Sequence, residues 1–109
     1  MCGINGIFSR VGATDLIALG SRMNALIQHR GPDDEGMVVF NEKKAFPKAS
    51  PKSVQREDGI NYLEYVDAHS NDVYGFFGHQ RLSILDLSAL GHEPLADETG
   101  NYWLTYNGE

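Results

Sequence analysis

The stretch Met1-Cys2-Gly3-Ile4-Asn5-Gly6-Ile7-Phe8 opens the chain and places a cysteine directly after the initiating methionine. Residues 2–8 predict a short strand, and its two glycines are typical of a place where a ligand or another backbone approaches closely. Once Met1 is removed, Cys2 carries a thiol and a free α-amine on one Cα. The amine can then act as general base for the thiol, directly or through a water. From its position alone, an ordinary small apolar residue is the commoner explanation of Cys2.

A helix is predicted after this strand. Thr14 and Asp15 are favoured helix-start residues, and the helix should end near Gln28, before a Gly-Pro pair. Gly20 inside it costs about 1 kcal/mol relative to alanine. Helical spacing predicts an apolar face made of Leu16, Leu19, Met23, Leu26 and Ile27.

Short strands make up most of the remaining pattern. We expect a turn-rich polar loop over residues 29–36, a polar stretch broken by prolines over residues 41–72, and a loop over residues 89–99 with a turn at 97–100. Strands are predicted over residues 37–40, 73–79, 82–87 and 101–106, with a further candidate at 60–66. A strand, a helix and then several strands predict an α+β fold with a largely antiparallel sheet.

Composition narrows the class of protein. The chain has 109 residues, of which 41% are hydrophobic, and this suits one small domain with a packed core. A net charge of -6 without a basic cluster argues against nucleic-acid binding. No apolar stretch is long enough to span a membrane, and no signal peptide is recognisable. A single cysteine cannot form an internal disulfide, so a reducing, cytoplasmic setting is expected.

Residues 81–109 contain groups able to assist acyl transfer from an amino-acid substrate. Asn107-Gly108 can supply a side-chain amide and a backbone N–H to a developing oxyanion, although Asn-Gly by itself more commonly marks a hairpin turn. The guanidinium of Arg81 suits an α-carboxylate, and Glu109 suits an α-ammonium group. Each of these charges, taken alone, is more commonly a surface residue.

A metal site is a weaker alternative. Asp33, Asp34 and Glu35 lie close to His29, but their spacing matches no calcium loop, and the flanking Pro-Gly chemistry indicates a turn. The other histidines lack partners at zinc spacing, so we expect no metal in this chain.

Four segments occur together, in the same order, in one family. They are residues 1–8, His-Arg-Gly-Pro-Asp-Asp-Glu-Gly at 29–36, Gly-His-Gln-Arg-Leu-Ser-Ile-Leu-Asp-Leu-Ser at 78–88, and Tyr-Asn-Gly-Glu at 106–109. With them the sequence resembles the N-terminal glutaminase domain of glutamine-hydrolysing asparagine synthetases, which are class II glutamine amidotransferases. Arg-Leu-Ser-Ile with Asn-Gly-Glu favours this branch over sister amidotransferases that also begin Cys-Gly-Ile.

The resemblance implies a fold and a set of roles. The fold would be part of an N-terminal-nucleophile hydrolase αββα sandwich with antiparallel sheets, and residues 1–109 would be a partial domain with an insertion at 41–72. Cys2 would be the nucleophile, with its amine as base. Asn107 and Gly108 would form the oxyanion hole, and the glutamine-binding residues would be Arg81, Leu82, Ser83, Ile84, Leu85, Asn107, Gly108 and Glu109. Arg30 would support the pocket.

The resemblance also implies a reaction. Glutamine would be hydrolysed to glutamate and ammonia, and a C-terminal synthetase domain absent from this chain would use ATP and Mg²⁺ to amidate aspartate. This chain itself would need no cofactor. Its partners would be glutamine and that synthetase domain, within a homodimer of the full-length protein. Two alternatives remain open: a truncated remnant without catalytic activity, and the glutaminase part of a relative that amidates a different carboxylate.

Overall fold

The computed structural model describes residues 1–9, 16–41, 45–48, 73–84 and 88–108 of the chain. Two expectations fall outside these residues and stay predictions: the helix start at Thr14 and Asp15, and the candidate strand over residues 60–66.

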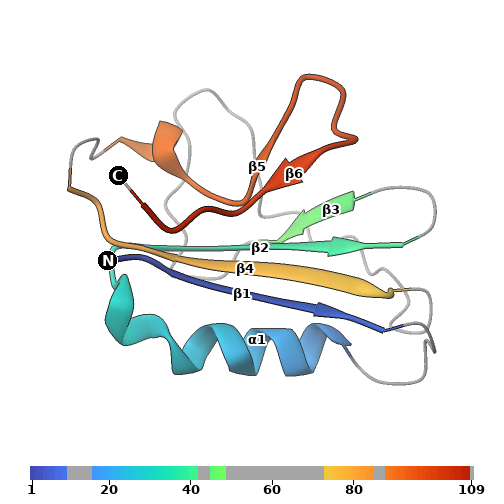
Figure 1. Ribbon diagram of the computed structural model, residues 1–109, viewed down its shortest axis with the longest axis horizontal. Coiled ribbons are helices and arrows are strands. Elements are labelled where there is room, and N and C mark those ends of the chain that lie inside the picture. Colours follow the sequence, from blue (N-terminus) through green and yellow to red (C-terminus); the bar gives the residue numbers. More distant parts are fainter. Residues whose placement is uncertain (10–15, 42–44, 49–72, 85–87, 109) are drawn as a thin grey trace.

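A four-stranded antiparallel sheet forms the centre of the molecule (Figure 1). Its strands lie in the order β1-β4-β2-β3, with bounds β1 Gly3–Phe8, β2 Asp34–Phe40, β3 Ala45–Lys48 and β4 Gly75–Arg81. The helix α1, Leu16–Leu26, covers one face of this sheet. This arrangement confirms the predicted α+β class with antiparallel strands.

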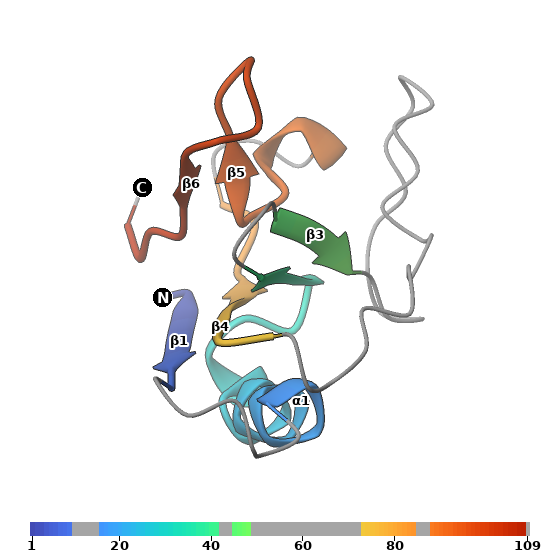
Figure 2. The ribbon, with the colours of Figure 1, turned by 90° about the vertical axis from the view of Figure 1, so that its right-hand side faces the viewer.

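A second layer lies on the other side of the sheet from α1 (Figure 2). It contains a short 3-10 helix η2, Ala89–Gly91, and the two-stranded pair of β5, Leu95–Ala96, with β6, Trp103–Leu104. The expected turn joins these strands, since the Gly100 N–H donates to the Asp97 carbonyl at 3.2 Å. The Thr99 hydroxyl also donates to the Asp97 carboxylate, which lowers the pKa of Asp97.

Several predicted strand boundaries were wrong. β2 begins at Asp34, inside the expected loop, because Asp34–Gly36 continue the antiparallel ladder with β4. A side chain at Gly36 would collide with the Glu93 carbonyl, so glycine is required where the second layer meets the sheet. β3 pairs with β2 within the stretch expected to be an insertion. Residues 82–84 form no strand, and β6 covers two residues of the predicted 101–106.

The predicted apolar face of α1 was right for Leu16, which is buried, and wrong for Leu19 and Leu26. Leu16, Ile17, Gly20 and Asn24 are the residues that α1 buries against the sheet. Leu19 and Leu26 are 42% and 76% exposed. The reason is the Phe76 ring of β4, which fills the space directly above Gly20 and so fixes the rotation of the helix. The core beneath the helix comprises Leu16, Ile17, Met37, Val39, Val73 and Phe76.

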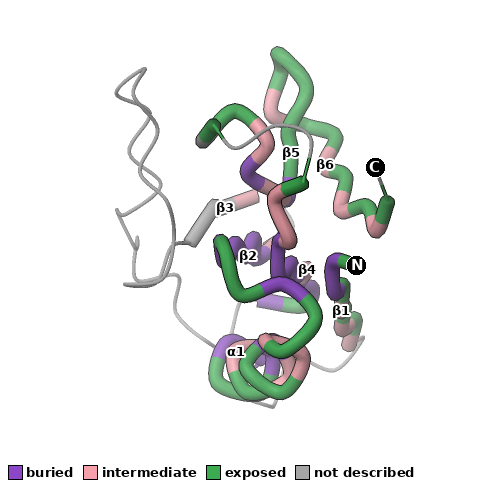
Figure 3. Tube along the Cα trace, turned by 90° about the vertical axis from the view of Figure 1, so that its left-hand side faces the viewer, coloured by how far each residue is buried: buried purple, intermediate pink, exposed green. Residues whose placement is uncertain are grey.

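Burial is greatest in β2 and β4, the central strands, and falls off toward β5, β6 and the end of the chain (Figure 3). On the sheet's other face the rings of Phe8, Phe40 and Phe77 meet, with Phe40 and Phe77 edge-to-face at 5.2 Å. In the described part of the chain, no helix is long and apolar enough to cross a membrane.

Replacing Gly20 by alanine is expected to destabilise the fold. An added Cβ would lie 2.6 Å from three atoms of the fully buried Phe76 ring. Overpacking of this kind costs about 1–3 kcal/mol, which exceeds the gain of about 1 kcal/mol from the helix preference of alanine. Urea unfolding measures the difference. Arg22→Ala, at an exposed position of the same helix, is the matched control and should change stability by about 0.5 kcal/mol or less. A Gly20→Ala variant as stable as the control would contradict the Phe76 contact.

Candidate active site

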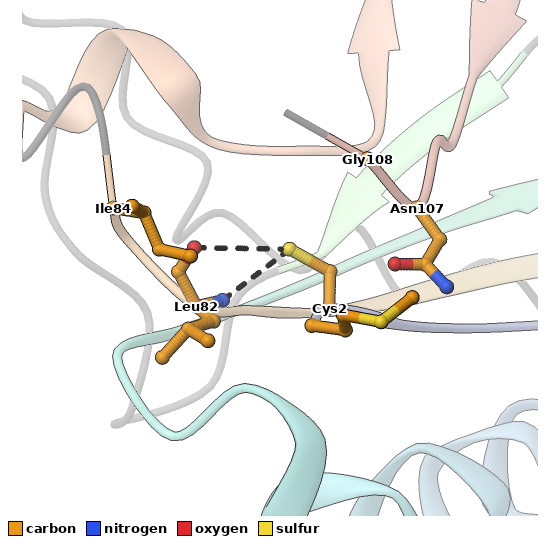
Figure 4. Close-up of a pocket in the computed structure, with 6 residues that line it drawn as sticks. Cys2, Leu82, Ile84, Asn107 and Gly108 are labelled. Atoms are coloured by element: carbon orange, nitrogen blue, oxygen red, sulfur yellow. Dashed lines mark hydrogen bonds between the residues drawn. The ribbon is translucent and has the colours of Figure 1, made fainter.

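Cys2 lies where the first strand begins. β1 pairs with β4 so that Gly3 stands opposite Gln80, and this register brings Cys2 beside the residues that follow β4. The Leu82 N–H donates to the Cys2 Sγ at 3.4 Å, and the Sγ lies 3.8 Å from the Leu82 carbonyl oxygen (Figure 4). The cysteine is 7% exposed. Sheet register therefore holds the thiol between the start of one strand and the end of its neighbour.

The backbone of Cys2 has its own anchor. Arg30, at the end of the 3-10 helix η1, Gln28–Arg30, donates from Nε to the Cys2 carbonyl at 3.1 Å. This contact agrees with the expectation that Arg30 supports the pocket. The Arg30 side chain binds the Cys2 carbonyl oxygen, and this hydrogen bond involves neither the thiol nor the backbone nitrogen of Cys2.

A small pocket lies beside the thiol. It is lined by Met1, Cys2, Leu82, Ile84, Asn107 and Gly108 and encloses about 20 Å³, which is room for about one water. The residues come from the two extremes of the described chain and from the segment after β4. Asn107 lies on the opposite side of Cys2 from Leu82, with its side chain turned toward the start of the chain (Figure 4). The structure therefore brings five of the expected site residues, and Met1, to one place.

The side-chain amide of Asn107 has an unsatisfied hydrogen-bond acceptor. Among the described residues, its Oδ1 atom is buried and has no hydrogen-bond partner. Buried polar atoms are seldom left unpaired, and each exception calls for an explanation. An amide beside a thiol with no protein partner for one of its atoms is available to bind a ligand.

The segment that carries Asn107 is held by the sheet beneath it. Glu93 accepts the Tyr106 N–H at Oε1, 2.8 Å away, and its Oε2 lies 3.0 Å from Nε2 of His79. The same Nε2 is 3.1 Å from the Tyr106 carbonyl oxygen. His79 is 1% exposed and belongs to β4. Neither His79 nor Glu93 was singled out as functional from the sequence, because no local motif points to a contact between residues 14 and 27 positions apart.

Two other expected substrate-binding residues, Arg81 and Ser83, do not line the pocket. Arg81 is 7% exposed, and its guanidinium donates to the Ser88 carbonyl at 2.6 Å and packs against Gly91. The Ser83 N–H donates to the Asp33 carboxylate at 2.8 Å. Leu85 and Glu109 are outside the described residues. The roles assigned to these four residues stay predictions.

The acidic cluster of residues 33–35 is divided among separate partners. Asp34 forms a buried pair with His92, whereas Glu35 accepts from the side chains of Asn24 at 3.1 Å and Gln80 at 3.0 Å. Across the described ranges, no group of three or more His, Cys, Asp or Glu side chains is arranged to hold a metal ion. The buried amides of Asn24 and Gln80 were not predicted from the sequence, because polar residues on a helix or strand are normally expected to face water.

Comparisons with known proteins find similar sequences among glutamine amidotransferases and asparagine synthetases. Residues 66–109 match the family described as the glutamine amidotransferase domain. An asparagine synthetase of Methanocaldococcus jannaschii, provisionally named glutamine-hydrolysing asparagine synthetase 2, is 38% identical over 95 residues, covering 87% of this chain and 13% of that protein. The glutamine-hydrolysing asparagine synthetase 1 of Bacillus subtilis is 30% identical over 112 residues, covering 100% of this chain and 12% of that protein. No solved structure matches the chain significantly.

Over residues 66–109 the chain matches the glutamine amidotransferase domain family, and the antiparallel α+β fold is compatible with that match. Over most of its length the chain is related to glutamine-hydrolysing asparagine synthetases. It spans about one eighth of the length of these curated relatives.

Proposed function

We propose that this chain carries the nucleophile of a glutaminase site, which hydrolyses glutamine to glutamate and ammonia. The observation that carries the proposal is the meeting of Cys2 with Asn107 and Gly108 around one pocket, although they are separated by most of the chain. A thiol that attacks an amide carbonyl needs hydrogen-bond donors for the developing oxyanion, and the NH₂ group of Asn107 and the backbone N–H of Gly108 are such donors.

The proposed reaction has two steps. The Cys2 sulfur forms a bond to the side-chain carbonyl carbon of glutamine, and the thiol proton passes to the α-amine of Cys2. The C–N bond then breaks, and the departing nitrogen takes up this proton and leaves as ammonia. A water hydrolyses the γ-glutamyl thioester, which releases glutamate and returns the proton to the sulfur. The Asn107 amide and the Gly108 N–H stabilise the oxyanion in both steps.

Met1 must be absent for this chemistry. With Met1 in place, the amine of Cys2 is tied up in a peptide bond and cannot act as base. Met1 also lines the pocket, whose present volume of about 20 Å³ is far too small for a glutamine side chain. Removal of Met1 would free the base and enlarge the space beside the sulfur at the same time.

The proposed fate of the ammonia rests on the relatives of this chain. Both relatives are named as asparagine synthetases, so we propose that a synthetase domain of the same protein, with ATP and Mg²⁺, transfers the ammonia to aspartate. A homodimer of that full-length protein and a cytoplasmic setting are part of this proposal, the second because the chain has a single cysteine. Arg81 and Glu109 are proposed to bind the two charged groups of glutamine, the carboxylate and the ammonium respectively.

Asn107→Ala is expected to reduce kcat for glutamine hydrolysis by about a hundredfold or more, because loss of one oxyanion donor costs this much. KM should change much less, since the interaction is made mainly in the transition state. Steady-state glutamate release measures both constants. Asn101→Ala, at an exposed position of the β5–β6 turn, is the control and should leave both unchanged. An Asn107→Ala variant with normal kcat would remove Asn107 from the oxyanion hole.

A further inference from the structure

The segment of residues 105–108 has few attachments to the rest of the molecule. It continues past β6 without forming a strand, and its residues are exposed or half-buried. Among the described residues, the hydrogen bonds that tie it to other elements are those of Tyr106 with Glu93 and His79. The orientation of Asn107 and Gly108 therefore depends on how Tyr106 is held.

Glu93 and His79 hold both peptide groups of Tyr106. The Glu93 carboxylate accepts the Tyr106 N–H at 2.8 Å, and the His79 Nε2 lies 3.1 Å from the Tyr106 carbonyl oxygen. That carbonyl belongs to the peptide unit that also contains the Asn107 N–H. Fixing it sets the direction in which the chain enters Asn107.

The contact between Glu93 and His79 makes the arrangement stiff. The Nε2 atom faces two acceptors, the Glu93 Oε2 at 3.0 Å and the Tyr106 carbonyl, so it must carry the hydrogen. The histidine is 1% exposed and the glutamate side chain 13% exposed, and His79 lies in the central strand β4. Charge-assisted hydrogen bonds in such a site are strong and directional.

We propose that Glu93, held by His79, is a positioning residue that sets Asn107 and Gly108 opposite the Cys2 sulfur. The inference rests on the proposed glutaminase function and adds to it a residue that acts through the Tyr106 backbone and does not line the pocket. Its consequence is kinetic. Small displacements of a group that stabilises the transition state lower kcat, whereas ground-state binding of the substrate changes less.

Glu93→Gln is the primary test, since glutamine matches glutamate in size but offers one acceptor where the carboxylate offers two. Its NH₂ group must oppose either the Nε2–H of His79 or the N–H of Tyr106. We expect kcat for glutamine to fall about ten- to hundredfold and KM to change by less than about threefold. His79→Gln retains an N–H donor near the Nε2 position and should recover most of the activity that His79→Leu loses.

A double-mutant cycle separates positioning from stability. If Glu93 positions the oxyanion hole, Glu93→Gln should lower kcat by a smaller factor in an Asn107→Ala background than in the parent, because one of the two donors that it positions is already gone and only the Gly108 N–H remains. Equal losses in both backgrounds, or failure of Glu93→Gln to fold in a thermal melt, would assign the contacts to stability and overturn the inference. So would a kcat within about threefold of the parent value, well short of the loss that misplacement predicts.

The parent protein distinguishes failure of the inference from failure of the proposed function. A parent that hydrolyses glutamine and reacts at Cys2 with a glutamine-like electrophile retains the proposed function, whatever the Glu93 variants do. A parent without either property refutes the function and, with it, the inference that depends on it.

Discussion

Replacing Cys2 by alanine is expected to abolish glutamine hydrolysis, with a fall in kcat of at least about a thousandfold. The reason is that the thioester cannot form without the sulfur, and loss of a nucleophile removes most of the catalytic advantage of sites of this kind. Release of glutamate and ammonia from glutamine is the measurement, made on the protein with Met1 removed.

The control for this variant is the stability of the fold. Among the described residues, the hydrogen bonds of the Cys2 side chain are two long sulfur contacts with Leu82, at 3.4 and 3.8 Å, and these are weak. Cys2→Ala should therefore melt within a few degrees of the parent. A folded Cys2→Ala protein that still hydrolyses glutamine at the parent rate would show that the nucleophile is elsewhere.

Retention of Met1 is expected to have an effect of similar size. Two forms can be released from a cleavable fusion partner, one beginning at Met1 and one at Cys2. We expect the form that keeps Met1 to show less than about one hundredth of the activity, because its Cys2 has no free amine and Met1 fills part of the pocket.

Iodoacetamide provides the control for this comparison, since it alkylates an accessible thiol without an oxyanion hole or a free amine. Labelling of both forms, together with activity in the shorter form alone, isolates the contribution of the amine and the open pocket. Equal glutaminase activity in the two forms would refute the role of the amine as base.

The parts of the fold that were predictable from sequence are those set by local pattern. The Gly-containing strand after Cys2 and the helix from Leu16 were both predicted close to their observed bounds. The turn at residues 97–100 followed from its Asp and Gly residues, which the structure uses as expected. Periodicity and turn chemistry act over a few residues, so no knowledge of tertiary contacts was needed.

The errors arise where distant residues decide the outcome. The rotation of α1 depends on the Phe76 ring above Gly20, and a helical wheel contains no information about that ring. Asp34 and Glu35 looked like loop residues, but His92, Asn24 and Gln80 satisfy them inside a buried strand. β3 was missed because Pro47 and the nearby lysines are poor strand residues, and pairing with β2 outweighs their local preference.

The residues of the candidate site also divide into those that a local motif reveals and those that only tertiary contacts reveal. Cys2, Asn107 and Gly108 were recognisable because each belongs to a motif, and the structure gathers them around one pocket. Glu93 belongs to none of the quoted motifs, and His79 lies in the motif over residues 78–88 but received no role, because the role proposed for both depends on contacts with the backbone of Tyr106. Residues that position other residues leave little trace in a single sequence.

The most direct test of the central claim is the intact mass of the protein after incubation with a diazo-ketone analogue of glutamine. We predict a mass lacking Met1, with one adduct on Cys2 that excess glutamine prevents and that Cys2→Ala eliminates. A folded protein that has lost Met1 but gains no adduct, or gains one that glutamine does not block, would contradict the claim that Cys2 is the nucleophile of a glutamine site.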